Sequence, residues 1–347
     1  MAKPTILLHI DCDAQASSFD AIVALDAGVQ QLITRSNVQP SQVQSLIHGT
    51  MFTRGPADLK NTAIFFGGSE VAESDSLFAL AQKCFFGPMR VSVMSDPNGC
   101  NTTAAAAVLA CQRHLTLDNK RVVILGGTGP VGQRIAQIIT ALNLNTEVVI
   151  GSRRIERAQA VIKRVVDHLR ESDPNFTDDL QPQLTPAALI SPSEALAVAS
   201  NADVIFSAGA AGVEFLDERW PETQASVLID LNAVPPAGIA NIPPTATGTK
   251  INDKICYGAI GVGELKMRIH KRAISRLFES NDQILDTQAI YKLGAELSNV
   301  AFRSAKEAFP TGPHNILLAI RFLKLNQQSL IKTASGHPKL SPIKKPT

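Results

Sequence analysis

The segment Arg121–Arg157 constrains the fold more than any other part of the chain. An apolar run leads into a glycine-rich loop, a helical pattern follows, and a second apolar run begins near Thr146. Gly127 allows a tight turn, Gly129 allows close approach of backbone to a pyrophosphate, and Gly132 allows the helix to pack closely on the strand. The free N–H groups at the start of such a helix bind phosphates. The loop therefore predicts a dinucleotide site whose contacts are Gly127, Thr128, Gly129, Pro130, Val131 and Gly132.

The end of the second apolar run bears on the choice of dinucleotide. Sites for NAD usually carry Asp or Glu there, about twenty residues beyond the loop. Here the sequence reads Ser152-Arg153-Arg154, and Glu147 lies too early in the run to serve. Guanidinium groups bind a 2′-phosphate through paired hydrogen bonds. The predicted cofactor is therefore NADP, with NAD as the alternative.

The rest of the chain alternates short apolar runs with helical patterns, which is typical of βαβ units around mainly parallel sheets. The predicted fold is a two-domain α/β protein with a Rossmann-type doubly wound domain. An N-terminal α/β domain covers residues 1–104 and is completed by helices in about 270–300; residues 105–269 form the dinucleotide domain. Residues Glu171–Pro192 are expected to be a surface insertion.

Strands are predicted at Thr5–Ile10, Thr62–Phe66, Arg90–Met94, Val122–Leu125, Glu147–Ile150, Val204–Phe206, Val227–Ile229 and Ile255–Ala259.

Helices are predicted at Ser17–Val29, Glu70–Cys84 and Glu264–Glu279, and Asn101 is expected to cap an alanine-rich helix. Two further strand ends are expected to border the nicotinamide, because ligands of α/β folds bind at the carboxyl ends of the strands. Asn232 offers a donor and an acceptor to a carboxamide. The residues predicted at these ends are Ser207, Ala208, Gly209 and Asn232.

Composition narrows the function further. A net charge of +2 with scattered basic residues, and an aromatic content of 5%, argue against a nucleic-acid footprint. Five cysteines without CxxC spacing fit reduced thiols better than disulfides or a zinc cage. The start of the chain lacks a signal-peptide pattern, and no run approaches membrane-spanning length. The expected location is the cytoplasm. Residues 300–347 are expected to form one amphipathic helix, Asn315–Leu330, and a disordered tail.

Several longer motifs resemble the NAD(P)-dependent methylene-tetrahydromethanopterin dehydrogenases of one-carbon metabolism, over residues 1 to about 298. They are DCDAQASSFDAIV, HGTMFTRG, NTAIFFGG, FFGPMRVS, NGCNTTAAA, GGTGPVG, FSAGAAGVE, DLNAVPPAGI, GAIGVGELKMRIHKR and LFESNDQILDTQAIYKL. The resemblance implies oxidation of a methylene-tetrahydropterin to the methenyl cation. It implies methanopterin before folate as the substrate, and a homo-oligomer, a trimer, in which a neighbouring subunit closes the cleft. Hydride loss from the methylene carbon needs no proton transfer, which agrees with the absence of an obvious acid/base pair.

The resemblance assigns active-site roles to Lys266, His270, Phe19 and Thr103. Lys266 and His270 stand four residues apart, so a helix places both on one face. We expect these two residues in the catalytic site and Phe19 and Thr103 in substrate binding. Without the family, the pair reads as a solvated helix face, Phe19 as a core aromatic, and Thr103 as a residue that satisfies backbone donors.

Asp11 and Asp13 follow a strand, and we expect them, with Asn101, to bind the pterin. Together with His9 and Cys12 they also suggest a metal site, but no metal is predicted. Two other functions stay open. A shikimate-dehydrogenase-like enzyme would need a Lys–Asp pair, for which Lys60 and Asp96 are the nearest candidates, although their surroundings do not match. A non-catalytic NADP-dependent sensor would use the C-terminal helix as a partner surface.

Overall fold

The chain contains two β-sheets, and the first is wholly parallel. The structure, a computed structural model, describes residues 3–142, 145–172 and 183–298. The first sheet has the order β12-β4-β3-β1-β2, and every neighbouring pair is parallel. Its central strands are almost completely buried, as expected for a parallel sheet with helices on its faces. The strands are β1 (Ile6–Asp11), β2 (Gln31–Arg35), β3 (Thr62–Gly67), β4 (Ser92–Ser95) and β12 (Ile284–Leu285).

The second sheet has the order β10-β11-β9-β8-β5-β6-β7, in which only the β10–β11 pair is antiparallel. The chain moves from β5 outward to β6 and β7, and then returns to β8 on the other side of β5. This reversal creates the crevice in which doubly wound folds bind ligands. The strands are β5 (Arg121–Leu125), β6 (Glu147–Ser152), β7 (Gln183–Ala188), β8 (Val204–Ser207), β9 (Val227–Asp230), β10 (Thr247–Ile251) and β11 (Lys254–Tyr257).

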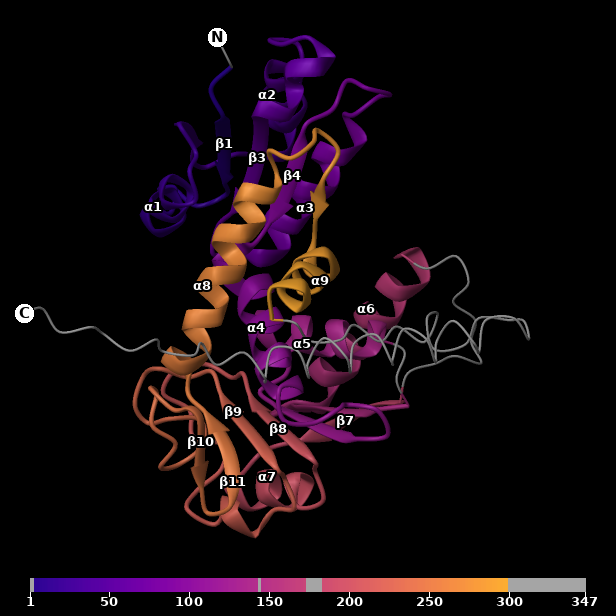
Figure 1. The fold of residues 1–347 in the computed structure, drawn as a ribbon. Helices are drawn as coiled ribbons and strands as arrows, with labels where there is room; N and C mark the ends of the chain where they lie inside the picture. Colours follow the sequence, from indigo (N-terminus) through magenta and orange to yellow (C-terminus); the bar gives the residue numbers. More distant parts are fainter. Residues whose placement is uncertain (1–2, 143–144, 173–182, 299–347) are drawn as a thin grey trace, which may run out of the picture. The chain divides into compact units, whose positions relative to one another are not determined.

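One alanine-rich helix, α4 (Cys100–Gln112), lies at the centre of the helical packing. It contacts α5, α8 and α9, and its residues Ala104–Cys111 are fully buried. Small side chains let these neighbours approach closely, and at Gly294 of α9 an added Cβ would lie 2.6 Å from Leu109. In Figure 1, α8 extends from β10 and β11, and it also contacts α1 of the first sheet. Helix α8 thus connects the two sheets.

The remaining helices follow the strands along the chain. Helix α1 is capped by the Ser17 hydroxyl, which accepts a hydrogen bond from the Asp20 N–H. The helices are α1 (Ser18–Asp26), α2 (Pro40–Met51), α3 (Val71–Lys83), α5 (Pro130–Ala141), α6 (Ile155–Ser172), α7 (Pro192–Ala199), α8 (Ala259–Arg276) and α9 (Thr287–Ser298), with short 3₁₀ turns η1 (Pro56–Asn61), η2 (Pro97–Gly99) and η4 (Trp220–Glu222). Within the described residues, none of these helices is long and apolar enough to cross a membrane.

The predicted α/β fold with parallel sheets is confirmed, and every predicted strand is present within a few residues of its expected position. Four further elements, β2, α2, β10 and β12, were not predicted from the sequence. The expectation of a surface insertion at Glu171–Pro192 is wrong for Gln183–Ala188, which pair with β6 as β7. This edge strand is half-buried or exposed along its whole length and contains Pro186, which lacks a backbone donor. It therefore has no apolar run that would reveal it in the sequence.

The predicted cap at Asn101 is also wrong, because helix α4 begins one residue earlier. The N–H groups of Asn101 and Thr102 donate to the Asp96 carboxylate, which lies just before the helix and caps it from there. The helix predicted at Asn315–Leu330 and the tail predicted after it lie outside the described residues.

Candidate functional site

The glycine loop between β5 and α5 is held in a close approach of backbone to backbone. The tight turn was predicted at Gly127. The residue with the left-handed φ, +66°, is Gly126, so the turn lies one residue earlier. A Cβ at Gly126 would lie 2.4 Å from the Cα of Gly209, and a Cβ at Gly132 would lie 2.6 Å from the Cα of Gly127. Side chains at these positions would therefore fill the loop. Gly129 is the N-cap of α5, Pro130 and Val131 form its first turn, and the Thr128 carbonyl accepts a hydrogen bond from Gln133.

The end of β6 places two arginines beside this loop. Arg153 and Arg154 are exposed, whereas Ser152 is buried and accepts a hydrogen bond from the Arg154 N–H at 3.3 Å. Arg153 lines a small cavity of about 80 Å³ together with Ser191 and Glu214. Within the described part of the chain, the Arg153 guanidinium makes no hydrogen bond or ion pair with the protein.

The end of β8 borders the same loop, and the end of β9 lies beside that of β8. Ser207 is fully buried, and Ala208 and Gly209 lead the chain past Gly126. Asn232 is buried, and both ends of its amide are bonded within its own loop: Nδ2 donates to the Pro236 carbonyl at 3.1 Å, and Oδ1 accepts from Val234 N–H at 3.0 Å. In this arrangement Asn232 shapes the loop that follows β9.

A second group of side chains gathers around Lys266 and His270 on α8. The Lys266 Nζ lies 3.5 Å from Nδ1 of His270 and 4.4 Å from the centroid of the Phe19 ring. Phe19 is 51% exposed, so much of its ring remains open to a ligand. His270 is fully buried and stacks on Phe65 at 5.7 Å between centroids. The structure thus brings together three of the predicted site residues: Phe19 of α1 with Lys266 and His270 of α8.

Burial makes His270 a neutral side chain at ordinary pH. Its pKa is lowered to about 4: burial is the largest cause, the charge of Asp96 opposes it, and the charges of Lys266 and His9 act in the same direction as burial. The Asp96 carboxylate lies 3.7 Å from His270 Nδ1 and also accepts from the Thr102 hydroxyl at 2.6 Å. A neutral imidazole can accept a hydrogen bond from the Lys266 ammonium at Nδ1. Such a pair orients Lys266 without adding a second positive charge.

Asp20, which the sequence analysis did not select, belongs to the same group. It is 7% exposed and follows Phe19 in the first turn of α1. The pKa of Asp20 is raised to about 6, and burial is the largest cause. The hydrogen bond with Ser17 and the charges of His9 and Lys266 lower this pKa, whereas the charge of Asp96 raises it. Its position on the buried face of α1, three and four residues before Val23 and Ala24, was the available sequence signal.

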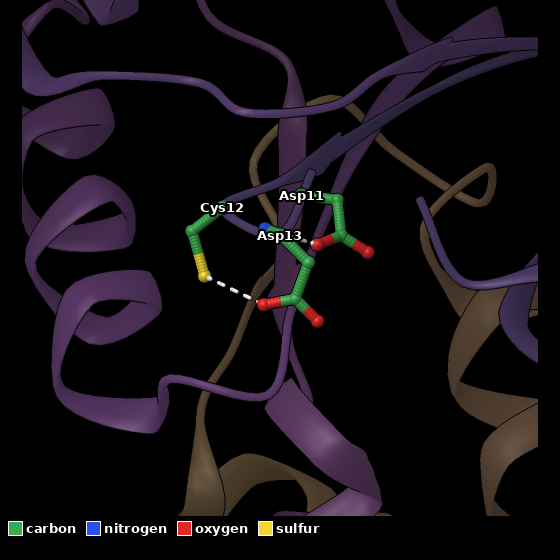
Figure 2. Close-up of side chains that lie close together, drawn as sticks. All are labelled: Asp11, Cys12 and Asp13. Carbon is green, nitrogen blue, oxygen red and sulfur yellow. Dashed lines mark hydrogen bonds between the residues drawn. The ribbon is translucent and has the colours of Figure 1, made fainter. Parts of the chain in front are cut away.

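The residues that follow β1 are bonded to nearby backbone groups. Figure 2 shows Asp11, Cys12 and Asp13 close together, with the Cys12 thiol directed at the Asp13 carboxylate. Asp11 accepts from the N–H groups of Asp13 and Ser17, at 2.8 and 3.0 Å, and Asp13 accepts from Ser69.

The titration of Asp11 and Cys12 is shifted in opposite directions. Burial alone would raise the pKa of Asp11, but hydrogen bonds from His9, Asp13 and Ser17 outweigh it and hold the pKa below its usual value. Burial raises the pKa of the Cys12 thiol to about 11. These carboxylates therefore shape the turn after β1.

Thr103 and Asn101 lie in the first turn of α4, whose N-cap residue Gly99 is next to the Lys266 side chain. Thr103 is half-buried, whereas Asn101 is buried and bonded to the Ser95 carbonyl and to the Thr287 hydroxyl. Asn101 thus points toward α9 and lines a cavity of about 400 Å³ that contains neither Lys266 nor His270. The structure does not bring Asn101 together with the α8 pair.

A cavity of about 510 Å³ lies between the end of β3 and the first turns of α5. Ser69 and Glu70, which follow β3, line it together with Pro130 and Gln133 of α5. The carboxyl end of the first sheet and the first turn of the glycine-loop helix therefore face the same space. Lys60 precedes β3, whereas Asp96 follows β4, so these two residues lie at opposite ends of the parallel sheet. They do not form the pair that a shikimate-dehydrogenase-like reaction needs.

Comparison with known proteins gives long sequence matches. A family model described as "Methylene-tetrahydromethanopterin dehydrogenase, N-terminal" matches residues 18–98. The chain is 36% identical over 297 residues to the "Bifunctional protein MdtA" of Methylorubrum extorquens, covering 84% of this chain and 99% of that protein. It is 33% identical over 293 residues to the "NAD(P)-dependent methylenetetrahydromethanopterin dehydrogenase" of the same organism, covering 81% and 95%. A shikimate 5-dehydrogenase structure from Listeria monocytogenes, in complex with shikimate and NAD, covers 84% of this chain and 96% of that one at 10% identity and a TM-score of 0.45.

Proposed function

We propose that this chain, which belongs to the methylene-tetrahydromethanopterin dehydrogenase family, moves hydride reversibly from methylene-tetrahydromethanopterin to NADP. The products are methenyl-tetrahydromethanopterin and NADPH. The observation that carries the proposal is the match at 36% identity over 99% of a relative, together with the half-buried Lys266, its buried partner His270 and the open Phe19 ring beside them. Both the cofactor loop and the α8 group fall within the matched length.

The residues around the glycine loop fit a dinucleotide. The hollow kept open by Gly126, Gly132 and Gly209 admits backbone approach to a pyrophosphate at the start of α5. When bound, the nicotinamide supplies a hydride acceptor. Arg153 supports NADP over NAD, because its exposed guanidinium at the end of β6 can hold a 2′-phosphate.

The α8 group would position the pterin rather than exchange protons with it. Hydride loss requires alignment of the methylene carbon, and no group here has to give or take a proton. The open Phe19 ring offers a stacking surface, and the half-buried Thr103 offers a hydroxyl nearby on α4. The buried, neutral His270 fixes Lys266, whose ammonium can donate hydrogen bonds to carbonyl or ring nitrogen acceptors of a pterin.

Steady-state rates with two pterins and two nicotinamide cofactors test the function. Purified protein should reduce NADP with methylene-tetrahydromethanopterin, with a higher kcat/KM than with NAD or with the folate analogue. Higher efficiency with methylene-tetrahydrofolate would instead make the chain a folate enzyme of the same reaction class. NADP binding with no turnover on either pterin would contradict the proposal and favour a sensor.

The same proposal assigns a different ligand to each of the two sheets. We assign pterin binding to residues 1–104 with about 270–300, and dinucleotide binding to residues 105–269. The chain is proposed to act as a homo-oligomer, a trimer. The exposed apolar side chains of Ile22 and Leu25 on α1, 60% and 53% exposed, support a subunit contact beside Phe19. Light scattering of the purified protein tests this, and a monomer at working concentration would contradict it.

A further inference from the structure

The carboxylates of Asp11, Asp20 and Asp96 are all buried, and they differ in what they bind. Asp11 accepts from two backbone N–H groups, and Asp96 accepts from the first N–H groups of α4 and from the Thr102 hydroxyl. Within the described residues, no backbone N–H donates to the Asp20 carboxylate. The carboxylates of Asp11 and Asp96 thus hold backbone groups, whereas the hydrogen bond to the Asp20 carboxylate comes from the Ser17 side chain.

The position of Asp20 relates it to the proposed substrate. Asp20 follows Phe19 in α1, and the Lys266 ammonium lies 4.4 Å from the centroid of the Phe19 ring. Helices α1 and α8 are in contact, and the field of Lys266 reaches Asp20. A ligand stacked on Phe19 would therefore lie within the electrostatic range of both a buried carboxylate and an ammonium.

The proposed reaction changes the charge of its substrate. The methylene carbon loses a hydride, which carries both electrons of the C–H bond to the dinucleotide, and no proton is released. Positive charge then spreads over the two nitrogens bonded to that carbon. A nearby ammonium opposes this change, and a buried carboxylate favours it, because charges interact strongly where water is excluded.

We propose that Asp20 is the counter-charge of this site, a buried carboxylate that offsets Lys266 and stabilises the methenyl cation relative to the neutral methylene substrate. The inference rests on the proposed function. It distinguishes Asp20 from a mere structural cap, since Ser17 already caps α1, and from Asp11 and Asp96, which hold backbone groups.

The test compares binding of the two redox forms. Asp20→Asn keeps the shape and removes the charge, Asp20→Glu restores the charge, and Asp26→Asn is the matched control on the same helix, exposed and paired with Lys271. Fluorescence titration without dinucleotide should show methenyl-tetrahydromethanopterin bound about tenfold or more weakly by Asp20→Asn. Binding of the methylene form should change less than threefold, Asp20→Glu should recover part of the loss, and Asp26→Asn should match the parent.

Kinetics give a second, independent readout. In Asp20→Asn, kcat for oxidation should fall about 100-fold while the KM for NADP stays constant. The parent should gain activity as pH rises through about 6, where Asp20 loses its proton, and the variant should lack this step. The groups whose charges or hydrogen bonds act on Asp20 are Ser17 of the same helix start, Lys266 of α8, Asp96 after β4 and His9 of β1. His270, the neighbour of Lys266, titrates near pH 4, outside this step.

The outcomes separate the two proposals. Equal weakening of both redox forms would show that Asp20 anchors the pterin ring, and would overturn the counter-charge role. Unchanged binding and rate in a folded Asp20→Asn, judged by its melting temperature, would overturn it as well. Failure of the parent protein to turn over any methylene-tetrahydropterin would instead overturn the proposed function.

Discussion

The glycine loop and the Lys266–His270 group are built from different parts of the chain. The loop is made of backbone, and its side chains are absent where they would intrude: an added Cβ at Gly126 or Gly132 would meet backbone atoms at 2.4 or 2.6 Å. The α8 group is made of ionisable side chains, with Lys266, His270 and Asp20 contributed by two helices. The first region should therefore be sensitive to added volume and the second to changes in charge.

The difference also concerns how each region is held in place. The loop is fixed by a strand and a helix that are adjacent in sequence, so its geometry is local. The α8 group joins residues as distant as Phe19 and His270, and its geometry depends on the packing of α1 and α8. Changes that loosen this packing should disturb the α8 group while the loop still binds its ligand.

The largest effect is expected from volume added to the loop. Gly132→Val places methyl groups against the backbone of Gly127, which cannot move without shifting β5 or α5. We expect the Kd for NADP to rise 100-fold or more, and the free energy of unfolding to fall by about 1–3 kcal/mol. Isothermal titration calorimetry and urea denaturation measure these quantities.

The matched control is Gly49→Ala, at an exposed position of α2 where an added Cβ meets no atom within 4 Å. It should leave NADP binding unchanged and stabilise the protein by up to about 1 kcal/mol, because alanine favours a helix over glycine. If Gly132→Val binds NADP within threefold of the parent, the loop is not a backbone-defined site and the contrast between the regions fails.

A pH effect of intermediate size is expected from His270. Its pKa of about 4 in the folded protein lies below the unfolded value near 6.5, so the unfolded chain binds this proton first. Stability is therefore lost as pH falls from 6.5 toward 4, by about 2 kcal/mol at pH 5. His270→Gln should remove this part of the pH dependence.

Urea denaturation of the parent and of His270→Gln at pH 7.5 and pH 5 measures how far the free energy of unfolding of each protein changes between the two pH values. Asp20 titrates in the same range with the opposite sign, because its raised pKa favours the protonated folded state as pH falls. Both proteins retain Asp20, so the difference between them reports on His270. An equal pH dependence in the two proteins would mean that His270 is not held neutral by burial.

The same contrast explains what could be predicted from the sequence. The glycine loop was found because its determinants are consecutive residues, and the pairing of Lys266 with His270 because four residues make one turn of a helix. Asp20, Asp96 and Phe65 were not assigned to the site, since only tertiary packing brings them to α8. Asn101 was expected at the substrate, but the capping of α4 by Asp96 turns its amide toward Thr287.

The smallest effect is expected where a side chain meets the backbone-defined region. Arg153 is exposed, so its contribution to binding a 2′-phosphate is reduced by solvent and should be about 1.4 kcal/mol, or tenfold in KM. Arg153→Ala should raise the KM for NADP by that factor and leave the KM for NAD nearly unchanged. Arg157→Ala changes an exposed arginine in the first turn of α6; it is the control and should leave both KM values unchanged.

Because the contact is ionic and exposed, raising the salt concentration should shrink the difference in the KM for NADP between the parent and Arg153→Ala. Equal effects on both cofactors would show that Arg153 supports the fold of the β6 end rather than the 2′-phosphate, and the preference for NADP would then need a different source.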